Sequence, residues 1–232
     1  MKRFLVGAAL VFSYVVASAQ TADDVVGKYI TAIGGKDNID KIKSVVMDGS
    51  ISVQGNAVNI TITKVEGKLF RTDISMMGMN GYTLVSDKDG WSYMPFMGQQ
   101  KAEAMSADMV KAGQSNLDIV GPLYYYQMQG AKFTLGADED VAGSKCFVLS
   151  STDSTSKETT TYYIDKTTYL LTRIKQPQEV MGQKMELAVD FSDYKDVQGV
   201  KMPFTIGQQM GNVTFSSIKP NTTIDDKLYK PQ

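Results

Sequence analysis

Histidine is absent from this chain of 232 residues, and cysteine occurs once, at Cys146. Imidazole is the side chain most often used for proton transfer near neutral pH and the commonest nitrogen ligand of zinc, so its absence excludes His-based triads and most zinc sites. A single thiol cannot form an internal disulfide, so the stability of the fold has to come from its core. Cys146 lies in an apolar, strand-like run, which indicates a buried structural thiol rather than a reactive one.

An excess of either charge is also lacking. The chain has 24 basic and 25 acidic residues, interspersed along its length, for a net charge of −1. The sequence therefore shows no cluster of basic residues that would bind nucleic acid or an anionic lipid surface. No paired carboxylate or Tyr/Lys constellation stands out as a catalytic site, so we expect a protein that is not an enzyme, with no cofactor and no metal.

The amino terminus has the pattern of a secretory signal peptide. Lys2 and Arg3 give a positive start, Phe4–Val16 is an almost unbroken apolar run, and the small residues Ala17 and Ala19 form a cleavage site. The apolar run is too short for a membrane span of about 20 residues. We expect residues 1–19 to be removed and residues 20–232 to form one periplasmic domain, which is not lipid-anchored because no cysteine follows the cleavage site.

The first element of the expected domain is a helix. Thr21 can cap it with the acidic Asp24 three residues later, apolar residues from Val25 to Ile33 fall on one side, and the Gly34–Gly35 pair ends it. From Ser44 to Glu66 the pattern alternates apolar and polar residues, which predicts two strands joined near Gly55.

Further short strands are expected along most of the remaining chain. Helical spacing interrupts them between residues 102 and 129, where one helix is expected around Met105–Val110 and another over Leu117–Met128, starting near Pro122. The acidic stretches at 138–140 and 225–226 are expected to be solvated loops. The even spacing predicts a mainly β, α+β fold with one strongly curved or barrel-like antiparallel sheet. The predicted strands are 69–74, 82–86, 91–94, 132–135, 145–151, 158–165, 169–175, 184–191, 202–206 and 213–218.

Methionine is the outlier of the composition. The chain has 14 methionines, and seven of them fall between Met76 and Met109. Flexible thioether side chains suit a surface that accommodates apolar ligands of varying shape. Gap-filling in an ordinary core and a soft-metal site for monovalent copper are the other two interpretations of this cluster.

Three segments resemble the lipoprotein-sorting proteins of the Lol type, the periplasmic carriers of outer-membrane lipoproteins. The first runs from Lys68 through Leu84 to Phe96, with the tight turn 87–90 inside it. The second comprises Tyr162–Asp165 and Leu170–Arg173, and the third is Phe191–Phe204. The similarity spans about residues 22–229.

This resemblance implies an incompletely closed antiparallel β-barrel with helices plugging its open side and an apolar cavity for acyl chains. Burying an acyl chain gains roughly 0.8 kcal/mol per CH₂, so the cavity has to be large and mostly apolar. The implied cargo is an acylated lipoprotein or lipid carried by a monomer, with handover proteins at the inner and outer membranes as possible partners. The residues expected to line the cavity are Val58, Ile60, Ile62, Phe70, Trp91, Met94, Phe96, Met105, Met109, Leu117, Leu123 and Tyr125.

The sequence departs from the family at one position. The carriers have a basic residue, important for passing cargo on, in the strand before the segment that starts at Lys68, and Lys64 matches it only approximately. The same fold also serves as a glycolipid binder and as an envelope-stress sensor domain, and a fold does not fix a function. The alternative to a carrier is a non-catalytic module that binds an envelope protein and has a filled core.

Overall fold

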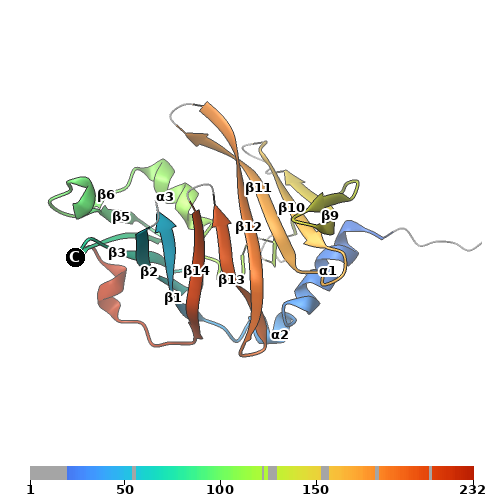
Figure 1. The fold of residues 1–232 in the computed structure, drawn as a ribbon, viewed down its shortest axis with the longest axis horizontal. Helices are drawn as coiled ribbons and strands as arrows, with labels where there is room; N and C mark the ends of the chain where they lie inside the picture. The colour runs from blue at the N-terminus through green and yellow to red at the C-terminus, as the bar shows by residue number, and fades with distance from the viewer. Residues whose placement is uncertain are drawn as a thin grey trace, which may run out of the picture.

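The computed structural model describes residues 20–53, 56–121, 123–124, 130–152, 157–180, 183–208 and 211–232. Its dominant feature is one antiparallel sheet of 14 strands, which curves strongly without closing into a barrel (Figure 1). The order across the sheet is β6-β5-β4-β3-β2-β1-β14-β13-β12-β11-β10-β9-β7, and β8 pairs with β9 beside β7. The mainly β, open-barrel fold with helices predicted from the sequence is therefore confirmed.

Most strands join their neighbours in sequence, and the pairing of β1 with β14 connects the two halves of the sheet. The first half consists of β1 (Ser44–Val53), β2 (Asn56–Val65), β3 (Leu69–Met76), β4 (Met79–Ser86), β5 (Gly90–Tyr93) and β6 (Glu103–Ala104). The second half consists of β7 (Thr134–Leu135), β8 (Glu139–Val141), β9 (Ser144–Thr152), β10 (Thr159–Asp165), β11 (Leu171–Val180), β12 (Gln183–Val197), β13 (Val200–Gln208) and β14 (Gly211–Pro220).

Helix α1 (Ala22–Ala32) begins at the capping box expected from the sequence. The Asp24 amide donates to Thr21 Oγ1 at 3.1 Å, and the Thr21 amide donates to Asp24 Oδ2 at 3.0 Å. These bonds satisfy two of the amides that a helix start leaves unpaired. The hydrogen bonds that the Thr21 amide and hydroxyl donate to the Asp24 carboxylate lower the pKa of that carboxyl. The short helix α2 (Lys36–Ile39) follows after Gly34 and Gly35, which both have positive φ.

Gly34 fixes the end of α1 against the sheet. A Cβ at this position would lie 2.1 Å from the Gly199 carbonyl oxygen, in the turn between β12 and β13. The Lys201 amide donates to the Ile33 carbonyl at 2.8 Å across the same contact. Only glycine permits both this φ of 127° and this approach.

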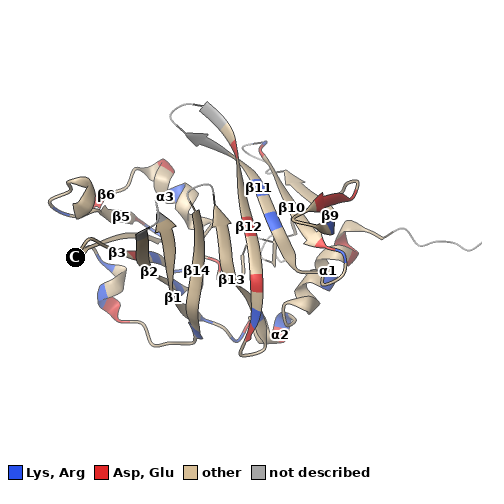
Figure 2. Ribbon diagram, viewed as in Figure 1, with Lys and Arg blue, Asp and Glu red and all other residues tan. Residues whose placement is uncertain are grey.

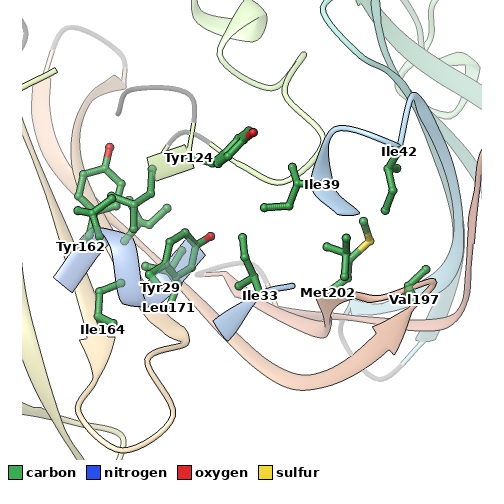
Figure 3. Close-up of a cluster of buried hydrophobic side chains, with 14 of the residues drawn as sticks. Tyr29, Ile33, Ile39, Ile42, Tyr124, Tyr162, Ile164, Leu171, Val197 and Met202 are labelled. Carbon is green, nitrogen blue, oxygen red and sulfur yellow. The ribbon is translucent and has the colours of Figure 1, made fainter. Parts of the chain in front are cut away.

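The main core lies between α1, α2 and one face of the sheet, which we call the inner face. Val25, Val26 and Tyr29 of α1 are fully or almost fully buried against it. In Figure 3, Tyr29 and Ile33 lie between the side chains of β10 and β11 on one side and those of β12 and β13 on the other. Because strand side chains alternate between faces, Ile60, Ile62 and Lys64 of β2 all belong to the inner face.

A second apolar cluster covers the opposite, outer face of the first half of the sheet. Leu69, Tyr82 and Leu84 are buried there, with Trp91 and Tyr93 packed beside them. The 3₁₀ helix η2 (Asp226–Tyr229) and the residues around it cover this cluster. The Arg71 side chain, 2% exposed, forms an ion pair with Asp73 at 2.7 Å and donates to the Leu228 carbonyl at 3.4 Å.

Three local predictions differ from the structure. Of residues 138–140, expected in a solvated loop, Glu139 and Asp140 lie in β8, although both remain exposed. Asp226 begins η2 instead of lying in an open loop. The helix expected around Met105–Val110 is α3 (Ala107–Gln114), but residues 117–121 are not helical. Only residues 123–124 of the second expected helix are described as helical, and Pro122 and residues 125–129 lie outside the described residues.

Candidate functional site

The candidate site is the inner face of the sheet together with the segment that covers it. We call residues 117–121 and 123–124 the covering segment. Leu117, Leu123 and Tyr124 are buried, and Ile119 and Val120 pack against the main core. The Tyr124 hydroxyl donates to Asp40 Oδ1 at 2.8 Å, just after α2. The covering segment therefore closes the inner face from the side opposite the strands.

Lys64 holds the covering segment to β2 from inside. Its ammonium group donates to the Asp118 carbonyl oxygen at 2.9 Å and lies 5.3 Å from the centre of the Phe70 ring. Burial lowers the pKa of Lys64 to about 8, although the carboxylates of Asp118 and Glu66 act in the opposite direction. A lysine on an otherwise apolar inner face carries a desolvation cost, which the carbonyl contact and the ring offset only in part.

Two further hydrogen bonds reinforce this attachment. The Ile119 amide donates to Glu66 Oε2 at 3.3 Å, and the Gly67 amide donates to the Leu117 carbonyl at 3.3 Å. Burial, together with the negative charge of Glu66, raises the pKa of the Asp118 carboxyl to about 6. We call Lys64, Glu66 and Asp118 the polar latch, because they connect the covering segment to the end of β2.

Several of the expected cavity residues share this inner face. Val58 and Ile60 are buried, Ile62 is partly buried and packs against the core, and Phe70 lies next to Lys64. Leu117 and Leu123 belong to the covering segment. Tyr125 lies outside the described residues.

Three more of the expected cavity residues lie over β4 and β5. Phe96, of the 3₁₀ helix η1 (Pro95–Met97), and Met94 lie over Gly81, where a Cβ would be 2.9 Å from Phe96 Cε1 and 3.2 Å from Met94 Sδ. Met105 lies over Gly90 in the same way. These contacts cover the inner face of β4 and β5.

Trp91 and Met109 are separate from the residues around Lys64. Trp91 packs on the outer face, beside Leu84. Trp91 also borders an open groove of about 580 Å³ between β5 and α3, which includes Met105, Val110 and Gln114. Met109 is 57% exposed on α3.

The polar latch is the part of the site that the list of expected cavity residues left out. The position of Lys64 in the sequence did indicate its direction. It is two residues from Ile62 and four from Ile60 in a strand with alternating side chains, so all three lie on the same face. Glu66 and Asp118 carried no comparable signal, since their roles depend on how the covering segment crosses the sheet.

Among the described residues, charged side chains and clusters of His, Cys, Asp or Glu mark no further site. Figure 2 shows basic and acidic residues interspersed, without a large region of one sign. In the described part of the chain, no three His, Cys, Asp or Glu side chains are grouped so as to hold a metal ion. None of the described helices is both long and apolar enough to cross a membrane.

Comparison with known proteins identifies the fold. No protein-family model matches the sequence, and neither does any curated protein. Solved structures do match. A LolA superfamily protein from Nitrosomonas europaea has 15% identity and a TM-score of 0.55, covering 91% of this chain and 98% of its own. A domain named as an outer membrane lipoprotein-sorting protein, from Vibrio parahaemolyticus, has 14% identity and a TM-score of 0.55, covering 89% and 94%.

A third similar structure widens the group. A DUF1329 family protein from Desulfovibrio piger has 13% identity and a TM-score of 0.53, covering 90% of this chain and 97% of its own. The chain thus has the fold of the LolA superfamily, as a divergent example. The resemblance indicated by the sequence is confirmed for the fold, and the function has to be argued from the site.

Proposed function

We propose that the protein is a periplasmic carrier that binds acylated molecules, lipids or lipoproteins, between the inner face of its sheet and the covering segment. The observation that carries this proposal is the polar latch. Lys64 places an ammonium group on an apolar face, where methionine or leucine would pack at lower cost, and uses it to hold the backbone of a separate segment.

The described structure corresponds to the closed form in this proposal. The inner face is filled by α1, α2 and the covering segment. An acyl chain gains access when the covering segment moves away from β2, and it then contacts the apolar residues that the segment covered. Each CH₂ it buries contributes roughly 0.8 kcal/mol, which offsets the lost contacts of the covering segment.

Release of the latch also exposes a polar anchor to the cargo. Once the Asp118 carbonyl has left, the Lys64 ammonium is free to bind the ester carbonyl or anionic head group of an acylated molecule. A carrier makes and breaks no covalent bond, so we assign no catalytic residue. Transport by one polypeptide requires inner- and outer-membrane partners that deliver and accept the cargo.

Binding of a fluorescent fatty acid, with native mass spectrometry of protein purified from its own periplasm, tests this proposal. We expect acylated molecules to co-purify and the probe to be displaced by them. Ile62→Gln introduces an amide on the inner face and should weaken probe binding about tenfold. Met109→Gln, the matched control on exposed α3, should leave binding unchanged.

Two results would contradict a carrier. One is an apo mass together with no probe binding by the unaltered protein. The other is equal loss of binding in both variants while each stays folded by circular dichroism. Either result would favour the alternative, a module that binds an envelope protein through its surface and has a filled core.

A further inference from the structure

Methionine side chains gather where the β3–β4 hairpin meets η1. Met76 ends β3, Met79 begins β4, and Met94 and Met97 belong to the segment that follows β5. Met97 is 78% exposed and Met79 is 38% exposed, and Met76 and Met94 are partly exposed. Methionines that fill gaps in a core are buried, so core packing does not account for this group.

Met76 and Met79 lie side by side on the inner face of the hairpin. They are paired directly across the tight β3–β4 turn. Opposed residues of an antiparallel pair have Cβ atoms about 4.5–5.5 Å apart. Met76 is two residues from Ile74, which pairs with Ile60 of the inner face, so both methionines belong to that face.

Met94 reaches the same face from the far side of β4. A Cβ on Gly81 would lie 3.2 Å from Met94 Sδ, so the missing side chain of this glycine leaves room for the sulfur. Residues 79 and 81 are on the same face of β4, about 7 Å apart. Because methionine has a flexible, unbranched side chain, the sulfurs of Met76, Met79 and Met94 are within reach of a common point.

The charges around these sulfurs favour a cation. No Lys or Arg occurs in residues 74–86 or 90–100. The Met94 amide donates to Gln99 Oε1 at 2.5 Å, and Gln99 Nε2 donates to the Glu103 carboxylate at 3.0 Å. The charged side chain that hydrogen bonds connect to Met94 is therefore an acid.

The donors of the chain select the kind of cation. Thioether sulfur is a soft ligand that suits monovalent copper, whereas oxygen ligands suit magnesium and calcium and imidazole suits zinc. The chain has no histidine, and its one thiol, Cys146, is buried, which raises the pKa of that thiol. In the described part of the chain no group of His, Cys, Asp or Glu could hold a metal ion. These absences argue against a divalent ion, but a thioether site needs none of those groups.

We infer that Met76, Met79 and Met94 form a thioether site for a soft monovalent metal ion, copper(I). Copper(I) has a filled d shell, as zinc has, and therefore imposes no geometry of its own, so three sulfurs from two flexible segments can hold it. The site lies at the end of β3 opposite Phe70, which pairs with Lys64. The inference therefore goes beyond the carrier function and does not rest on it.

Competition with a chromogenic copper(I) chelator, bicinchoninate, tests the inference. Copper(I), kept reduced under nitrogen, is titrated into the full chain, processed as in its own cell, and we expect one ion to be retained per chain. The double variant Met76→Leu/Met79→Leu keeps the apolar bulk but removes two sulfurs, and it should bind at least about tenfold more weakly. The matched control Met109→Leu/Met185→Leu replaces two methionines that are 57% and 47% exposed on other elements and should bind like the unaltered protein.

Methyl NMR locates the ion. Silver(I) is a soft monovalent probe that needs no reductant, and it is added to protein with isotope-labelled methionine methyl groups. The signals of Met76, Met79 and Met94, assigned with single substitutions to leucine, should shift together. Zinc should shift none of these signals.

Three outcomes would overturn the inference: no copper(I) retained by the unaltered protein against the chelator, equal loss in both double variants, or signal shifts confined to other methionines. Cys146→Ala tests the other soft donor of the chain. Unchanged binding in this variant would support the thioether site, and loss of binding would assign the ion to the thiol instead.

Discussion

Replacing Lys64 by methionine should make the protein more stable at neutral pH. The pKa of Lys64 is about 8 in the folded protein, against about 10.4 for an unperturbed lysine. The folded state therefore disfavours the ammonium form by roughly 3 kcal/mol at pH 7. Methionine of similar length removes this cost but leaves the Asp118 carbonyl without its donor, which costs about 1 kcal/mol. We expect a net gain of roughly 2 kcal/mol in the free energy of unfolding.

The gain should disappear as the pH rises. Between the folded pKa and the unfolded pKa, the unfolded chain binds more protons at Lys64 than the folded one, so the unaltered protein gains stability with rising pH. From pH 7 to pH 9.5 this contribution amounts to about 2 kcal/mol. The difference between the unaltered protein and Lys64→Met, measured by urea unfolding at both pH values, should shrink by that amount.

Lys64→Arg is the control for this pH dependence, because a guanidinium stays charged at pH 9.5. Its difference from Lys64→Met should remain constant over the same range. Parallel pH profiles of the unaltered protein and Lys64→Met would show that the Lys64 ammonium is solvated. In that case the Lys64 ammonium would not lower the free energy of unfolding, and the inner face would not keep a charge at the expense of stability.

Three further predictions concern the fold that supports the site. Leu149→Ala in the fully buried core should lower the free energy of unfolding by about 2–5 kcal/mol, as measured by urea unfolding. Gly34→Ala should lower the melting temperature far more than Gly35→Ala, because a Cβ at 34 meets a backbone carbonyl at 2.1 Å and one at 35 meets nothing within 4 Å; equal effects would refute the contact. Arg71→Met should release the segment that contains η2, so limited proteolysis should cut after Lys227 or Lys230 sooner than in the unaltered protein.

The elements with a clear period were predictable from the sequence. The capped first helix and most strands of the second half follow from apolar spacing and turn residues, although β11 and β12 extend to Val180 and Val197, beyond the expected 175 and 191, and β8 was not predicted as a strand. The inward direction of Ile60 and Ile62 also follows from alternation alone.

The face of the sheet on which each β5 side chain lies was not predictable in the same way. Its inner face is covered by Met105 and α3, and its outer face by the cluster that includes Leu84, so both faces carry apolar contacts. Without a solvated face there is no alternation to show which way Trp91 points. The covering segment posed a related difficulty, because its apolar residues are buried on several sides without forming a helix over 117–121.

The strands that end the sheet have a consequence for its behaviour in solution. An open sheet normally presents a row of free amides and carbonyls on which a second chain can add a strand and begin to aggregate. Here β6 and β7 contain two residues each, and β6 includes the exposed, charged Glu103. Beside β7, the three residues of β8 pair with the other end of β9. A sheet of 14 strands can therefore remain open to a ligand without presenting a long edge strand on which another copy of the chain could pair.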